Sequence, residues 1–209
     1  MATYDLEEQE QLAALKAWWK QYGNLVLGTI TAVLLLLAAW NGWRWYQRTQ
    51  ALEAATLYEN LQTAARSGEI KAARDAAGSI LEKYAGTAYA PLAALVSARM
   101  SHGAGDLKTA SAQLRWVIDN AGQENLRTLA RLRLAAVLLD DNKFDAAMKA
   151  IEAKPAEAFL AEYASMRGDI LWAQKKRIEA RTAYKAALDK TIDATFREIL
   201  RLKLDAIGE

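Results

Sequence analysis

An uncharged apolar run near the amino terminus is the feature that most limits how this chain can fold. The run extends from Leu25 to Trp40, and with Asn24 and residues 41–43 it forms about 20 helical residues, or roughly 30 Å of helix. That length matches the hydrocarbon core of a bilayer. Helices in the core of a globular protein rarely continue so far without a charge. The run therefore predicts a single membrane-spanning helix over residues 24–46.

A cleaved signal peptide is one alternative for this run, and a helix buried in a globular core is the other. Signal peptides begin with basic residues and end at a small-residue cleavage site, whereas here acids precede the run and bulky tryptophans follow it. Aromatic rings at both ends favour the membrane span, because such rings anchor among lipid headgroups. The predicted interface anchors are Trp18, Trp19, Tyr22, Trp43, Arg44, Trp45 and Tyr46.

Basic residues do not fix the orientation of the predicted span. Lys16 and Lys20 precede it, Arg44 and Arg48 follow it, and a long carboxyl-terminal domain can cross a membrane whatever its own charge. Residues 1–23 leave two alternatives open. Apolar residues at helical spacing, with acids early and lysines late, favour a short interfacial helix; the other alternative is a flexible tail with anchoring aromatics.

One face of the predicted span is rich in small residues. Such a face lets another membrane helix pack closely, although glycine and alanine are also simply common in membrane helices. Both interpretations stay open. The candidate packing residues are Gly28, Ala32, Leu35, Ala39 and Gly42.

The remainder of the chain has the composition of a soluble helical domain. Residues 47–209 carry 24 basic and 21 acidic side chains, and the whole chain has a formal charge of +2, so no strong field selects nucleic acid. Only 11 glycines and two prolines are present, too few for the frequent turns of an all-β fold. The chain has no cysteine, which excludes disulfides, thiol catalysis and thiolate metal sites.

Four alanines mark an internal repeat in this domain. Ala73, Ala110, Ala147 and Ala180 follow small or polar turns at nearly even intervals, which are close to the length of a tetratricopeptide (TPR) repeat. The last unit fits the small, large, small, aromatic and small pattern of that repeat best. The predicted repeat-packing residues are Ala73, Ala110, Ala147, Gly168, Ala180, Tyr184 and Ala187. An irregular helical bundle is the alternative.

The fold class predicted from these patterns is all-α, with an amino-terminal single transmembrane helix followed by a TPR-like α-solenoid. Residues 51–65 continue the span as one helix, and an amphipathic stretch from Phe196 to Ile207 closes the end of the stack. The predicted segments are residues 1–23, 24–46 and 47–209. Thr109 and Arg181 interrupt the small-residue rhythm, so the number of repeats stays open.

Catalytic chemistry finds no support in the sequence. His102 is the only histidine and lies in a polar loop, with nothing beside it to mark a catalytic triad. The acid pairs Glu7–Glu8 and Asp140–Asp141 are interpreted as a solvated tail and a helix-capping turn. No metal-ligand cluster or phosphate-binding loop is present, so we expect no cofactor and no enzymatic activity.

Taken together, four segments resemble the YfgM family, the ancillary subunits of the SecYEG translocon. They are YDLEEQEQ, LAALKAWWKQYGN, NGWRWYQ and ALEAATLYENL, of which residues 16–24 and 42–46 are the most specific. The resemblance implies a single-pass inner-membrane protein of Gram-negative bacteria with a cytoplasmic amino terminus and a periplasmic TPR-like domain. It also implies contact with the translocon, with a PpiD-like periplasmic chaperone and with newly exported polypeptides. The resemblance carries over no catalytic or binding residues.

The functional hypothesis is a membrane-tethered interaction module of the secretion machinery. A tether keeps the repeats close to the membrane and raises the effective concentration of neighbouring partners. The alternative is a TPR scaffold that assembles another complex of the cell envelope. An enzyme comes third.

Overall fold

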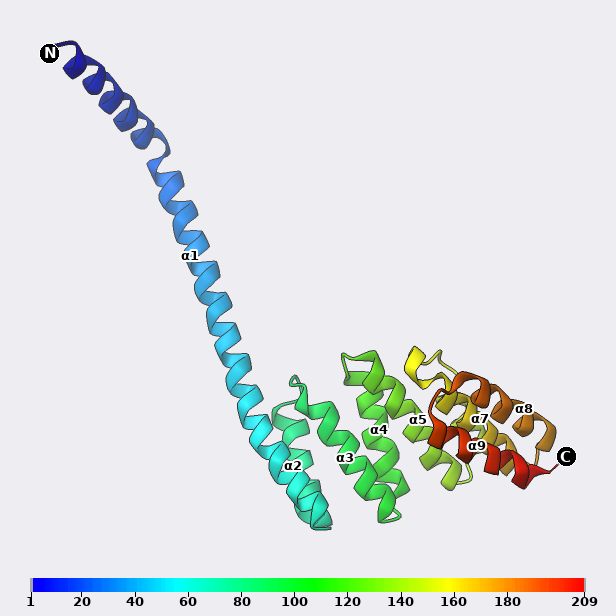
Figure 1. Ribbon diagram of the computed structural model, residues 1–209. Coiled ribbons are helices and arrows are strands. Elements are labelled where there is room, and N and C mark those ends of the chain that lie inside the picture. Colours follow the sequence, from blue (N-terminus) through cyan, green and yellow to red (C-terminus); the bar gives the residue numbers. More distant parts are fainter. Residues whose placement is uncertain (1, 209) are drawn as a thin grey trace. The chain divides into compact units, whose positions relative to one another are not determined.

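The computed structural model describes the backbone of residues 2–208 and the side chains of residues 8–208. All regular structure in this part of the chain is helical, which confirms the predicted all-α class. The elements are α1 (Ala2–Arg66), α2 (Ile70–Lys83), α3 (Tyr89–Gly103), α4 (Leu107–Asn120), α5 (Glu124–Asp140), α6 (Phe144–Ala150), the short 3₁₀ helix η1 (Glu157–Phe159), α7 (Leu160–Ala173), α8 (Arg177–Lys190) and α9 (Ala194–Ile207) (Figure 1).

Helix α1 is 65 residues long and contributes to two compact units. The first unit ends at Gln50, and the second begins at Ala51 and continues to the end of the chain. In the first unit every side chain from Leu27 to Arg48 is exposed, although this stretch contains most of the apolar run. Within the described residues, α1 is the one helix that is long and apolar enough to cross a membrane. Its last part, residues 51–66, belongs to the second unit and begins the repeats.

The second unit contains four helix pairs, and a turn of the same design joins the two helices of each pair. Each turn contains one residue with positive φ: Gly68 (73°), Gly105 (79°), Asn142 (56°) and Lys175 (64°). The N–H of the following residue donates to a carbonyl five residues back, with N···O distances of 2.8–2.9 Å. This bond is the signature of a Schellman turn, which ends a helix by satisfying a terminal carbonyl. The pairs are α1 (residues 51–66) with α2, α3 with α4, α5 with α6, and α7 with α8.

Lys175 adopts a left-handed conformation, in which the Cβ atom of the lysine crowds the following carbonyl. Glycine has no Cβ and adopts this conformation more easily. We expect Lys175→Gly to raise the free energy of unfolding by about 0.5–1 kcal/mol, since relief of this strain exceeds the entropy cost of glycine. Chemical denaturation measures the change. Lys176→Gly is the control, because Lys176 has a φ of −85° and gains nothing from glycine. Equal effects of the two substitutions would contradict the strain at Lys175.

The alanines that mark the repeat each lie five residues after a positive-φ residue and are fully buried or nearly so, with 0–1% exposure. Their N–H groups donate to the carbonyls of Glu69, Asp106, Lys143 and Lys176, which closes the first turn of each second helix. A methyl group at this step lets the second helix of a pair lie close to its neighbours. The alanine period therefore follows from the geometry of the turn.

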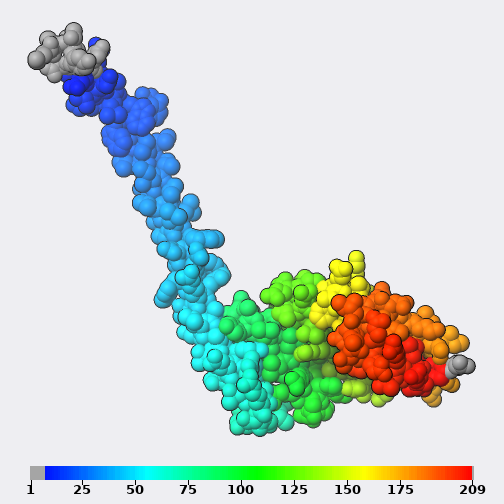
Figure 2. Space-filling view, in the orientation of Figure 1, coloured from blue at the N-terminus to red at the C-terminus, as the bar shows by residue number. Residues whose placement is uncertain are grey.

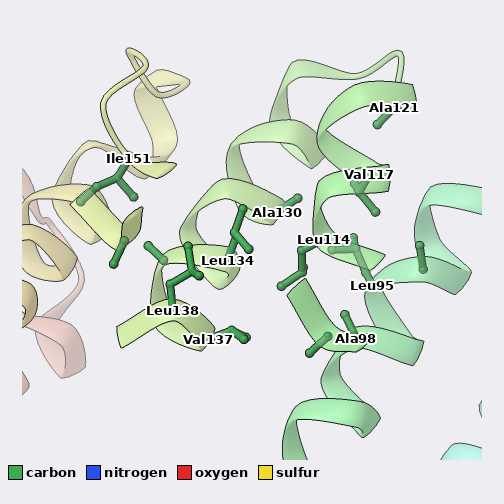
Figure 3. Close-up of a cluster of buried hydrophobic side chains, with 14 of the residues drawn as sticks. Leu95, Ala98, Leu114, Val117, Ala121, Ala130, Leu134, Val137, Leu138 and Ile151 are labelled. Atoms are coloured by element: carbon green, nitrogen blue, oxygen red, sulfur yellow. The ribbon is translucent and has the colours of Figure 1, made fainter. Parts of the chain in front are cut away.

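The repeats share a core built of three neighbouring clusters. The first joins the end of α1 to α2 and α3 through Leu61 and Ile80. The second and largest extends from α3 to α7; Figure 3 shows Leu114 and Leu134 among its side chains. The third joins α7 and α8 to α9, whose Leu200 and Ile207 are buried. Helix α9 thus covers the end of the stack, in the place where the sequence predicted a capping helix.

Candidate functional site

The second unit has two layers of helices with different spacing. The first helices of neighbouring pairs contact one another directly, as α3 does with α5 and α5 does with α7, whereas the second helices α2, α4 and α6 pack on the first helix of the next pair. Successive pairs follow one another in chain order across the surface in Figure 2. We call the surface of the first helices the inner face and the surface of the second helices the outer face.

Among the predicted repeat-packing residues, Gly168 and Tyr184 make the closest contact. A Cβ atom on Gly168 would lie 2.5 Å from Cε1 of Tyr184 and 2.6 Å from Cδ1, so only glycine leaves room for this ring. Tyr184 is 3% exposed, and Ala187 on the same helix is fully buried. The glycine thus allows α8 to approach α7 closely.

A polar network beside this contact ties α7, α8 and α9 together. The Tyr184 hydroxyl donates to Asp169 Oδ1 at 2.6 Å, and Lys203 Nζ from α9 donates to both Asp169 oxygens at 2.7 and 2.8 Å and to Ser165 at 3.2 Å. Burial, with the hydrogen bond to the Asp169 carboxylate as a second cause, holds the pKa of Tyr184 far above its usual value. The network stabilises the last repeat and its cap.

The raised pKa of Tyr184 predicts a loss of stability at alkaline pH. Above about pH 10 the unfolded tyrosine releases its proton while folded Tyr184 keeps it, so unfolding becomes easier by about 1.4 kcal/mol per pH unit. Tyr184→Phe lacks this proton. We therefore expect the stability difference between wild type and Tyr184→Phe, measured by urea denaturation, to shrink as the pH rises from 9.5 to 11. A difference that stays constant over this range would contradict the prediction.

The predicted membrane residues lie on exposed parts of α1. Gly28, Ala32, Leu35, Ala39 and Gly42 are all exposed, and a Cβ on Gly28 or Gly42 would meet nothing within 4 Å. The predicted small-residue face is therefore not covered within the first unit.

The predicted anchoring aromatics gather at the two ends of the apolar run. The rings of Trp18 and Tyr22 lie 5.8 Å apart, and those of Trp43 and Tyr46 lie 6.2 Å apart, measured between centroids. Trp19 packs on Gly23, whose Cβ would lie 3.2 Å from the indole. Arg44 and Trp45 are exposed beside them.

The histidine and the acid pair that the sequence analysis considered for catalysis form contacts between side chains on the surface of the repeats. His102 Nε2 lies 2.6 Å from Asp140 Oδ2, and both side chains are substantially exposed. Asp141 pairs with Lys143 at 2.6 Å across a repeat turn. Glu7 lies outside the residues whose side chains are described. No group of three or more potential metal-ligating residues occurs in the described part of the chain.

Three arginines on the inner face were missed by sequence reasoning. Arg66, Arg99 and Arg133 lie on the first helices α1, α3 and α5, at a spacing close to the repeat period. Burial, and the nearby charge of Arg99 as a second cause, lower the pKa of Arg133. The spacing of these arginines is visible in the sequence, but the alanine pattern that marks the repeat does not point to them. We call these residues the arginine row.

A groove on the outer face lies between α8 and the loop after α6. Helix α6 has seven residues, whereas α2, α4 and α8 each have 14, and the missing half leaves a hollow of about 520 Å³ over α7. Its apolar lining includes Leu160, Tyr163, Leu171 and Ile178. We call this the outer groove.

The stacked helix pairs, their shared turn and their terminal cap define a TPR-like helical-repeat protein. The family model for the tetratricopeptide repeat-like domain matches residues 16–209. The chain is 32% identical to the ancillary SecYEG translocon subunit of Neisseria gonorrhoeae over 97% of this chain and 98% of that protein. Its identity to the subunit of the same name is 29% in Escherichia coli, over 96% and 97% of the two chains, and 28% in Haemophilus influenzae, over 88% and 90%. The chain belongs to this family, the YfgM family. No solved structure matches it.

Proposed function

We propose that this protein is a membrane-anchored interaction subunit of the SecYEG translocon. The observation that carries the proposal is the likeness over nearly the whole chain to relatives named as ancillary subunits of that translocon. The repeats supply a large helical surface of the kind that binds polypeptides. The fold offers an interaction surface on each face and needs no chemistry for this role.

The membrane anchor in this proposal is the part of α1 over residues 24–46. A helix that is apolar on all sides is stable only when protein or lipid surrounds it, and the described part of the chain leaves all of these side chains except Val26 exposed. Lipid satisfies that requirement. Residues 1–23 then lie in the cytoplasm and residues 47–209 in the periplasm, in the arrangement that the family resemblance implies.

The repeats would then receive polypeptides as they leave the translocon and pass them to a periplasmic chaperone of the PpiD type. Tethering supports this role, because it holds the repeats within a few tens of ångströms of the membrane, where a partner of modest affinity is bound more often. The small-residue face at Gly28 and Gly42 is the proposed contact with another membrane helix.

Site-specific photo-crosslinking in membranes of the native host tests this proposal. A benzophenone amino acid replaces Gly28 in the span, Arg99 on the inner face or Ile178 in the outer groove. We expect adducts with translocon subunits from the span and with periplasmic chaperones or exported polypeptides from the repeats. Capture of envelope-assembly proteins without translocon subunits would overturn the proposal in favour of a scaffold.

The orientation has its own test. A topology reporter fused after Glu209, either alkaline phosphatase or β-galactosidase, is active only on one side of the membrane. We expect phosphatase activity and no galactosidase activity. The reverse pattern would refute the periplasmic placement of the repeats while leaving the membrane anchor intact.

A further inference from the structure

The arginine row forms one continuous strip across the inner face. One hollow of about 500 Å³ is lined by Arg66 from α1 and Arg99 from α3, and a second of about 290 Å³ is lined by Arg99 and by Arg133 from α5. Because Arg99 lines both hollows, the two are neighbours. Helices in contact lie about 10 Å apart, so the strip is about 20 Å long.

The acids of α5 are paired with side chains other than the row arginines, although His102, the partner of Asp140, lines the second hollow. Helix α3 contains no acid, and α5 contains Glu124 and Asp140 near its two ends. Glu124 binds Arg127 at 2.6 Å and Arg131 at 2.9 Å, and Asp140 binds His102 at 2.6 Å. None of the row arginines forms a salt bridge within residues 8–208.

The acids of the last part of α1 do not neutralise the row either. Glu53 accepts a hydrogen bond from the Tyr84 hydroxyl at 2.8 Å. Glu59 forms no salt bridge with Arg66 or with any other side chain of residues 8–208. The inner face of the first three repeats therefore carries three positive charges without a counter-charge in contact.

Part of the surface between the arginines is apolar. Ala65, Val96 and Met100 line the first hollow together with Gln62, and Ala98 and Val137 line the second together with His102. A small anion would neutralise the arginine charges but would leave the apolar side chains in contact with water. A polypeptide that alternates carboxylates with apolar side chains would satisfy both, because complementary charge sets its position while the apolar contact adds affinity.

We propose that the arginine row binds an acidic segment of a partner polypeptide in extended conformation. A polyproline-like segment presents every third side chain on the same side with a repeat of about 9 Å, close to the spacing of the first helices. About seven residues, with acids three positions apart, therefore match the row. This inference rests on the proposed interaction role of the repeats and names the chemistry of one partner.

Fluorescence anisotropy with the full-length protein in neutral detergent tests the inference. The probe is a rhodamine-labelled peptide of twelve residues with glutamate at every third position and alanine or leucine between. The row variant is Arg66→Gln/Arg99→Gln/Arg133→Gln, which keeps long polar side chains. We expect saturable binding by wild type that weakens with salt, and a loss of about tenfold or more in the row variant.

The matched control removes the same charge from the outer face. Arg115, Lys149 and Lys185 are exposed on α4, α6 and α8 and form no salt bridge within residues 8–208. Their replacement by glutamine should change the affinity by less than about twofold, since only general attraction is lost. Arg99 lines both hollows, so Arg99→Gln alone should weaken binding about threefold. This single variant keeps the inference testable if the triple variant does not fold.

Each other outcome overturns the inference. The inference fails if the wild type does not bind the acidic peptide, or if the row and control variants lose equal affinity. It also fails if a peptide with glutamine in place of glutamate binds equally well, or if the protein binds phosphatidylglycerol vesicles but not the peptide. Copurification of the wild-type protein with the translocon, measured in parallel, separates the two proposals. If the translocon copurifies but the acidic peptide does not bind, the inference fails and the proposed function stands.

Discussion

Gly168→Ala should lower the free energy of unfolding by about 2–3 kcal/mol, which is unusual for a substitution that normally favours a helix. The added methyl would lie 2.5–2.9 Å from three atoms of the Tyr184 ring. That ring is buried and its hydroxyl is held by Asp169, so it cannot move aside without breaking other contacts. The melting temperature should fall by roughly 5–10 °C for a domain of this size.

Gly78→Ala is the matched control for this prediction. Gly78 lies in the interior of α2, is exposed, and has nothing within 4 Å of the position of a Cβ. The same chemical change should there stabilise the protein by up to about 1 kcal/mol, because alanine is the better helix former.

A second substitution at Tyr184 identifies the cause. Tyr184→Phe keeps the ring atoms that would clash and should not relieve the defect of Gly168→Ala. Tyr184→Leu removes them, so the double variant Gly168→Ala/Tyr184→Leu should lose less stability than the sum of the single variants. Additive losses, or equal effects of alanine at Gly168 and Gly78, would show that the contact between α7 and α8 is not as close as the structure has it.

The repeat fold could be predicted because its strongest constraint is local. A turn with one positive-φ residue places a buried alanine five residues later, and this distance stays fixed in every pair. The turn residue itself is harder to recognise, since Lys175 and Asn142 occupy the position that Gly68 and Gly105 fill elsewhere. The buried alanine was therefore a better marker of the repeat than the turn.

The length of α6 could not be predicted from the alanine pattern. The stretch after Asn142 has the same small and apolar spacing as the other second helices, yet the helix ends at Ala150. Pro155 disfavours helical conformation at Lys154, which limits how far the helix could have continued. The resulting outer groove depends on how the loop lies over α7 and α8, and this is a property of the packed structure.

The arginine row was missed because exposed arginines on a helix are usually part of a solvated face. The sequence shows Arg66, Arg99 and Arg133 close to the repeat period, but it does not show which arginines have partners. Glu124 lies close enough in sequence to pair with several cations of α5. Only the folded chain shows that it binds Arg127 and Arg131 and leaves Arg133 without a carboxylate.

Two charges in the middle of the proposed span should prevent its insertion. Nine Leu, Ile and Val residues between Leu25 and Leu37 favour insertion by roughly 3–5 kcal/mol in total, while each arginine near the centre opposes it by about 2.5–3.5 kcal/mol. One arginine is therefore nearly balanced, but Leu34→Arg/Leu36→Arg exceeds the favourable sum. We expect this variant to leave the membrane fraction on alkaline carbonate extraction and to lose phosphatase activity from a reporter after Glu209.

The control for the span places the same two charges outside it. Leu12 and Leu15 are exposed on α1 before the apolar run, so Leu12→Arg/Leu15→Arg should remain in the membrane. Basic residues at that end also favour its retention in the cytoplasm. If α1 were instead covered by protein outside the bilayer, carbonate would extract the wild type and Leu34→Arg/Leu36→Arg alike. Equal extraction of the wild type and this variant, or equal retention of both, would therefore contradict the prediction.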